Sequence, residues 1–172
     1  MSDKTEDRLF QKLYHWSLKY LELRPRSEKE VQDFLRLKAV RNIKKGWLMV
    51  PEGELLEVVT EEVIKKLREL KLVNDLEFAA VWVASRGASR SIRVLKGELF
   101  KKGISQDIIA TQLSGQKKSQ DELLKKLISK AKLKYRREES RPAKQKVISY
   151  LLRRGFAWEE IRQAVDEQSV TD

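Results

Sequence analysis

The chain has 172 residues, no cysteine, and 37 Lys and Arg against 26 Asp and Glu, a formal charge of +11. The lack of cysteine excludes disulfide bonds, thiolate nucleophiles and cysteine-based zinc sites, and it fits a reducing cytoplasm. The first residues contain no apolar signal core, and no later run approaches the roughly 18 apolar residues of a membrane span. We therefore expect a cytoplasmic protein without a membrane partner.

The positive charge is unevenly distributed and predicts an anionic partner. Residues 116–155 hold 14 Lys and Arg against four Asp and Glu, a net +10, whereas residues 1–115 hold 22 against 17, a net +5. Such a charge favours binding to nucleic acid, to an acidic protein groove or to an anionic membrane. We expect the anion-facing surface to be carboxy-terminal.

The first predicted helix carries an apolar stripe at helical spacing and ends before Pro25. The stripe consists of Leu9, Leu13, Trp16, Tyr20 and Leu23. Ser27 and Glu30 have the spacing of a capping box, which predicts the start of a second helix. Thr60, followed by two glutamates, predicts the start of a third helix that runs to Leu70.

An irregular insertion is predicted at about residues 41–57, between the second and third helices. It contains the apolar run Trp47 to Val50, which is costly to expose. The first interpretation is a loop or short hairpin folded over the core of the first three helices. The alternative is a partner-binding knob centred on Trp47.

A second group of three helices is predicted from Asn74 onward. Asn74 caps the first of them, and Ser89 begins the next. This second helix should end at Lys101 to Ile104, where Gly103 adopts a left-handed conformation and Ile104 folds back on Leu99. Ser105 then caps a short helix that carries Ile108, Ile109 and Leu113.

The same helix ending returns 52 residues after Gly103, as Arg153-Arg154-Gly155-Phe156. Before it, Ser119 and Glu122 predict a capping box, and Pro142 predicts another helix start. Glu159 and Glu160 open the last helix. The pattern predicts an all-α protein built from a repeated three-helix unit, with no sheet except around the insertion.

Several of these segments resemble the RecX family. The second repeat of that family is matched by Asn74 to Ala79, Trp82 to Arg86, Ile92 to Leu99 and Lys102 to Ile104. Arg26 to Val31 and Leu70 to Asp75 are similar to the first repeat, and Arg141 to Val165 to the third. The chain departs from the family where the first repeat's second helix usually ends in Lys-Gly, because Lys38-Ala39 or Lys45-Gly46 stands there.

The resemblance implies three tandem three-helix repeats stacked into an elongated, curved body. They would span residues 7–72, 74–114 and 117–168, with flexible termini at 1–6 and 169–172. RecX proteins bind along the groove of the filament that RecA forms on single-stranded DNA. The resemblance therefore implies a monomeric protein that regulates, by inhibition, filament growth, strand exchange and coprotease activity. It also implies a role in DNA repair, homologous recombination and the SOS response.

The candidate filament- or DNA-binding residues are basic, because clustered cations would meet acidic side chains or phosphates. They are Arg86, Arg90, Arg93, Lys96, Lys101, Lys102, Arg136, Arg137, Arg141, Lys144, Lys146, Arg153 and Arg154. Any one of them is equally well explained as part of a solvated helix face. Lys102 and Arg154 also complement the negative end of a helix dipole.

Other residues give weaker indications. The aromatic residues Trp16, Trp82, Tyr135, Tyr150 and Trp158 fit a core better than stacking on single-stranded DNA. His15 is the only histidine and lacks the companions of a metal site. The sequence contains no phosphate-binding glycine loop and no nucleophile elbow, so we expect no enzyme, no metal and no cofactor. The alternative function is a helical protein that acts directly on single- or double-stranded DNA.

Overall fold

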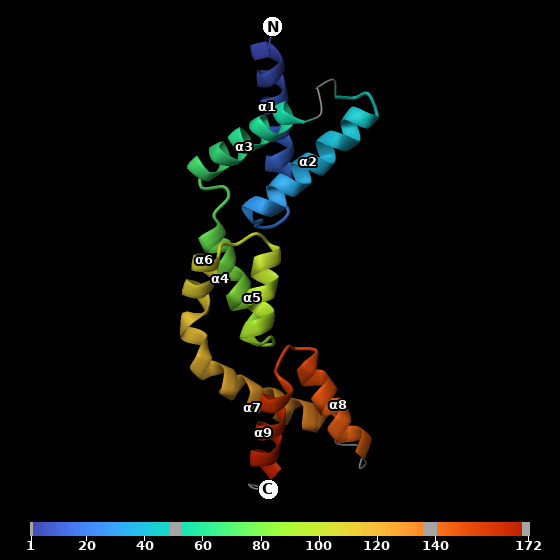
Figure 1. The fold of residues 1–172 in the computed structure, drawn as a ribbon, viewed down its shortest axis with the longest axis vertical. Helices are drawn as coiled ribbons and strands as arrows, with labels where there is room; N and C mark the ends of the chain where they lie inside the picture. Colours follow the sequence, from blue (N-terminus) through green and yellow to red (C-terminus); the bar gives the residue numbers. More distant parts are fainter. Residues whose placement is uncertain (1, 49–52, 136–140, 170–172) are drawn as a thin grey trace. The chain divides into compact units, whose positions relative to one another are not determined.

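The computed structural model describes residues 2–48, 53–135 and 141–169, and almost all of them are helical (Figure 1). These ranges contain no strand, which confirms the all-α prediction. The chain divides into two compact units. One holds the residues up to 78 together with 102–104, and the other holds residues 79–101 and those from 105 on.

The first unit contains α1 (Ser2–Leu21), α2 (Glu28–Lys44) and α3 (Glu54–Glu69), and each of the three helices packs against the other two (Figure 1). Their shared core is apolar, as expected for helices with one apolar stripe each. Its most buried members include Leu9, Leu13, Val31, Leu35, Val59, Val63 and Leu67. Leu23, which the sequence placed on the stripe, lies beyond the end of α1 and is 77% exposed.

The predicted insertion is shorter than expected. The second helix continues to Lys44 and the third begins at Glu54, so both ends of the 41–57 segment are helical. Basic residues in the last turn of α2 and acidic residues in the first turn of α3 favour these extensions, because they complement the helix dipoles. Leu48 joins the core and Trp47 is 67% exposed, while residues 49–52 lie outside the described part of the chain.

One predicted helix start in the first unit is wrong. Thr60 is buried inside α3, where its hydroxyl donates to the carbonyl oxygen of Leu56 at 2.6 Å, so the side chain is satisfied without ending the helix. At the amino terminus, α1 already begins at Ser2, within the terminal residues expected to lie outside the first repeat. No glycine or proline stands between Ser2 and the core residue Leu9 to interrupt the helix.

The second unit contains most of α4, followed by five further helices and one short 3-10 turn. The elements are α4 (Asp75–Arg86), α5 (Ile92–Lys101), α6 (Gln106–Leu113), the 3-10 turn (Ser114–Gln116), α7 (Lys117–Tyr135), α8 (Arg141–Leu152) and α9 (Trp158–Ser169). Three of them, α7, α8 and α9, pack around one apolar core (Figure 1). This core includes Leu124, Leu127, Ile128, Leu151, Phe156 and Ile161.

The capping predictions divide into confirmed and wrong ones. Asn74 accepts the backbone amides of Leu76 and Glu77 at 3.0 and 3.3 Å, and Ser105 accepts that of Ile108 at 3.3 Å. The predicted start at Ser89 is wrong, because α5 begins at Ile92 after a cap by a later serine. The start at Ser119 is also wrong, since α7 follows the 3-10 turn directly and begins at Lys117.

Candidate partner-binding surface

Within the first unit, the turn at residues 102–104 is bound to the start of α2. Ser27 closes the predicted capping box with Glu30, and its buried hydroxyl also donates to the carbonyl oxygen of Lys102 at 2.7 Å. Gly103 has a φ of 80°, as predicted, and a Cβ added there would lie 2.5 Å from the Cβ of Lys29. Both the backbone conformation and the close approach to α2 therefore require glycine.

The second unit repeats this arrangement at the start of α5. Ser91 caps α5, and its hydroxyl donates to the carbonyl oxygen of Gly155 at 2.7 Å, while its backbone amide donates to the carbonyl oxygen of Arg154 at 2.9 Å. Gly155 has a φ of 89°, and an added Cβ would lie 2.1 Å from Cγ2 of Val94. In both units a serine that caps a helix therefore binds a glycine turn, through the carbonyl of Lys102 in the first and that of Gly155 in the second.

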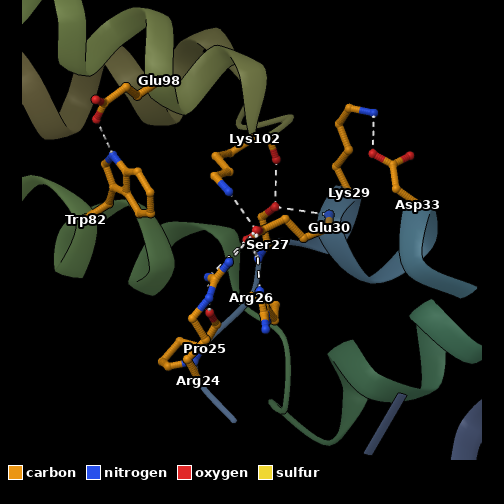
Figure 2. A network of polar contacts seen from close by, with 10 residues as sticks. All are labelled: Arg24, Pro25, Arg26, Ser27, Lys29, Glu30, Asp33, Trp82, Glu98 and Lys102. Atoms are coloured by element: carbon orange, nitrogen blue, oxygen red, sulfur yellow. Dashed lines mark hydrogen bonds and ion pairs between the residues drawn. The ribbon is translucent and has the colours of Figure 1, made fainter. Parts of the chain in front are cut away.

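The carboxylate of Glu30 lies close to several cationic side chains (Figure 2). It pairs with Arg24 at 2.7 Å and with Lys102 at 2.6 Å, and Arg26 lies 3.8 Å away. Burial opposes ionisation of Glu30, but the hydrogen bonds from Arg24 and Lys102 outweigh it, so the pKa of Glu30 lies below its ordinary value. Lys102, a candidate contact residue, is therefore engaged inside the first unit.

Glu98 binds two side chains of α4, and Figure 2 shows the contact with one of them, Trp82. It accepts from the indole nitrogen of Trp82 at 2.9 Å and forms an ion pair with Arg86 at 2.8 Å. The Arg86 guanidinium also lies 4.9 Å from the centre of the Trp82 ring. Arg86 is thus held by its own unit, and Glu98, the only acid of α5, is turned toward α4.

Three other candidate cations of the second unit are exposed. Arg93, Lys96 and Lys101 all lie on α5, and within the described ranges no carboxylate comes within ion-pair distance of any of them. Phe100 lies among them with 63% of its surface exposed. Their positive charge therefore remains available to a partner.

The carboxy-terminal candidates have more varied surroundings. Arg90 donates to the carbonyl oxygen of Arg153 at 3.0 Å, which leaves the exposed Arg153 side chain beside the start of α5. Arg154 lies 3.6 Å from the centre of the Tyr150 ring. Lys144 and Lys146 are exposed on α8. Arg136 and Arg137 lie outside the described residues, as does the side chain of Arg141, whose backbone begins α8.

The sequence reasoning missed a group of cations and aromatic rings on α1, on α2 and in the segment between them. Tyr20 stacks on Phe34 with ring centres 4.0 Å apart, and Arg26 lies 4.0 Å from the Tyr20 ring. Lys38 lies 4.8 Å from the Trp16 ring. Burial, followed by repulsion from Lys19, lowers the pKa of Lys38 below its ordinary value. The four-residue spacings of Phe34 and Lys38 and of Trp16 and Tyr20 were sequence signals for this group.

The described side chains offer no group of three or more His, Cys, Asp or Glu residues able to hold a metal ion. His15 is exposed on α1. A hollow of about 420 Å³ lies in the second unit against α5, α7 and α9, and Ser91, Gln120, Leu124 and Phe156 are among its lining residues. None of the helices in the ranges that the structure covers is long and apolar enough to cross a membrane.

Comparison with known proteins gives consistent matches. Two family models match the chain, described as the second three-helix domain of RecX over residues 74–113 and the third three-helix domain of RecX over residues 119–165. The regulatory protein RecX of Bacillus pumilus is 33% identical over 159 residues, which is 90% of this chain and 54% of that protein. That of Leuconostoc mesenteroides is 30% identical over 137 residues, 78% of this chain and 51% of that protein.

Solved structures are similar over a larger share of their length. The crystal structure of RecX from Lactobacillus salivarius has a TM-score of 0.68 and 28% sequence identity, and the match covers 95% of this chain and 99% of that one. A second crystal structure of a regulatory protein RecX has a TM-score of 0.67 at 26% identity. By contrast, the chain spans about half the length of the curated relatives it matches.

Proposed function

Because the chain belongs to the RecX family of regulatory proteins, we propose that it regulates the RecA recombinase by binding the filament that RecA forms on single-stranded DNA. The observation that carries this proposal is the pair of matched three-helix domains in tandem. Repeats at 7–72, 74–114 and 117–168 are part of the proposal. The chain acts by binding and not by catalysis.

The physical means is a set of linked contacts to successive subunits of a filament. Tandem repeats present neighbouring surfaces to such a partner. Once one repeat is bound, the next finds its site at a high effective concentration, so the assembled filament is preferred over free subunits. The exposed cations of α5 and α8 raise the association rate and meet acidic side chains or phosphates. A body bound in the groove would obstruct filament growth, strand exchange and coprotease activity.

A titration of RecA activity tests the proposal. ATP hydrolysis by RecA on single-stranded DNA and strand exchange should both fall as the protein is added, and the effect should saturate. A variant with Arg136, Arg137, Arg141, Lys144 and Lys146 replaced by Gln should inhibit less, because it lacks the cations of the most basic segment. Full RecA activity at saturating protein would refute the function, and unchanged inhibition by the variant would refute this choice of residues.

The net charge of +10 in residues 116–155 also favours a second candidate, a helical protein that binds DNA directly. Retention on single-stranded DNA, measured at one fixed salt concentration with and without RecA and nucleotide, separates the two functions. Filament regulation predicts tight retention only when RecA and nucleotide are present. Tight binding to bare DNA with sequence preference would favour the second candidate.

A further inference from the structure

Gly97 lies in the interior of α5, and none of the described residues requires a glycine at this position. A Cβ added at Gly97 would meet no atom within 4 Å, and its backbone is helical. Gly103 and Gly155, by contrast, combine a left-handed backbone with a close approach to another side chain. Glycine in a helix interior is less stable than alanine, so Gly97 weakens α5 without relieving a contact with any of the described residues.

The residues around Gly97 form one continuous face. Arg93, Lys96, Gly97 and Phe100 have the spacing that places side chains on one side of a helix. All four are exposed, and the Phe100 ring shows 63% of its surface. We call these four residues the α5 face.

The two charged residues of the α5 face are both cations, because the acid of the same helix is bound elsewhere, although Arg93 also lines the hollow that Asp121 and Glu160 share. Glu98 is held by Trp82 at 2.9 Å, as Figure 2 shows, and by Arg86 at 2.8 Å. Arg93 and Lys96 have no carboxylate within ion-pair distance in the described ranges. Protein interfaces commonly have an aromatic residue at the centre and charged residues at the rim. Phe100 fits the centre, and Arg93 and Lys96 fit the rim. Gly97, which has no side chain, exposes the helix backbone beside them.

We propose that the α5 face docks on an acidic groove of the protein part of the filament. The Phe100 ring fills an apolar depression in that groove, Arg93 and Lys96 meet its carboxylates, and the partner's main chain lies against Gly97. The missing side chain at Gly97 allows this close approach. This assignment rests on the proposed function and names the surface through which it acts.

A protein surface fits this face better than nucleic acid does. Single-stranded DNA is bound by several aromatic platforms along the strand, and Phe100 is the only aromatic residue in α5. A duplex backbone offers phosphates for Arg93 and Lys96 but no apolar depression for the ring. The α5 face combines one exposed aromatic ring, two cations and a glycine without a side chain. This combination favours binding to an acidic groove of a protein.

Substitutions at Gly97 test the proposal because they should change stability and binding in opposite directions. Gly97→Ala and Gly97→Gln remove a helix-interior glycine in open space, so the melting temperature should rise by about 2–4 °C. The dissociation constant for the RecA filament on single-stranded DNA should increase about threefold for Gly97→Ala and about tenfold or more for Gly97→Gln. Phe100→Ala should weaken binding about tenfold or more without lowering the melting temperature.

Leu133→Ala is the matched control, because Leu133 is an equally exposed apolar residue, 71% exposed, on α7. It should leave filament binding unchanged. Stabilised Gly97 variants that bind the filament as the unsubstituted protein does would overturn the proposal. Equal losses of affinity for bare single-stranded DNA would overturn it in favour of a nucleic-acid contact. Failure of the unsubstituted protein to bind the filament would instead refute the proposed function.

Discussion

The hydroxyl of Ser91 donates to the carbonyl oxygen of Gly155 across 2.7 Å, and both residues are buried. The same hydroxyl accepts from the amide of Val94 at the start of α5. Ser27 does the same in the first unit, with Lys102 as acceptor and Glu30 as amide donor. One serine side chain therefore caps a helix and binds a distant turn, so its loss should be felt at both places.

Ser91→Ala should lower the free energy of unfolding by about 1–3 kcal/mol, since it removes a helix cap and leaves the buried Gly155 carbonyl without this donor. Urea denaturation measures the change. The matched control is Ser89→Ala, because Ser89 is less buried and its hydroxyl bonds locally to Arg86 at 3.3 Å. A loss for Ser91→Ala no greater than that of the control would contradict the double role.

Gly155→Ala should cost at least about 2 kcal/mol, because the new Cβ enters a left-handed backbone conformation and would lie 2.1 Å from Cγ2 of Val94. Adding Val94→Ala removes the contact with Cγ2, but the approach to Oγ of Ser91 at 2.7 Å and the backbone strain remain, so the double variant should recover only part of the loss. Gly115→Ala, in open space, is the control and should change stability little. Thermal and urea unfolding together check this order, and equal stability of Gly155→Ala and the control would contradict it.

The start or end of a helix could be predicted from the sequence where a single local motif, such as a capping box or a left-handed glycine, determines it. The capping box of Ser27 and the left-handed Gly103 and Gly155 were correct, because each depends on residues within one or two turns. The predicted start at Thr60 was wrong for the opposite reason. A hydroxyl can cap a helix or bond back to the preceding turn, and burial of the surrounding apolar residues decides between the two.

The candidate cations could be listed from the sequence, but the sequence could not show which of them are held in ion pairs within the protein. Arg86 is held by Glu98, 12 residues away, and Lys102 by Glu30, 72 residues away. No local pattern indicates pairs at such separations, because they depend on how helices pack. The importance of Gly97 was likewise hidden, since open space around a glycine is a property of the folded chain.

The ion pair between Arg86 and Glu98 should show measurable coupling. A double-mutant cycle with Arg86→Met and Glu98→Gln should give about 0.5–1 kcal/mol, because the pair is only partly buried and Glu98→Gln keeps a side-chain oxygen that can accept from Trp82. The pair of Lys29 and Asp33 on α2 is the control. Both of its side chains are 48% exposed, so we expect about 0.3 kcal/mol. Urea unfolding of the single and double variants gives both values, and a coupling for Arg86 and Glu98 below that of the control would contradict the prediction.

Acid should destabilise the protein partly through Glu30. Burial alone would raise the pKa of Glu30, but the hydrogen bonds from Arg24 and Lys102 outweigh it, so the pKa in the folded chain lies below its ordinary value of 4.5. Its contribution to stability is therefore complete above about pH 4.5 and is lost as the pH falls through the lower, folded value. Glu30→Gln should be less stable at neutral pH and should lose less stability between pH 5 and pH 3.

Asp75 should change the pH dependence of the free energy of unfolding in the direction opposite to Glu30. Its burial outweighs the hydrogen bond from the amide of Glu28, so its pKa lies above the ordinary value of 3.8 and stability falls as the pH rises through that range. Asp75→Asn keeps an oxygen that can accept from Glu28 at a present distance of 2.9 Å, but it removes the titration. The free energy of unfolding should then rise more steeply between pH 3 and pH 5 than in the unsubstituted chain. Urea unfolding at closely spaced pH values measures both slopes, and slopes that change in the same direction for the two variants would contradict the assignment.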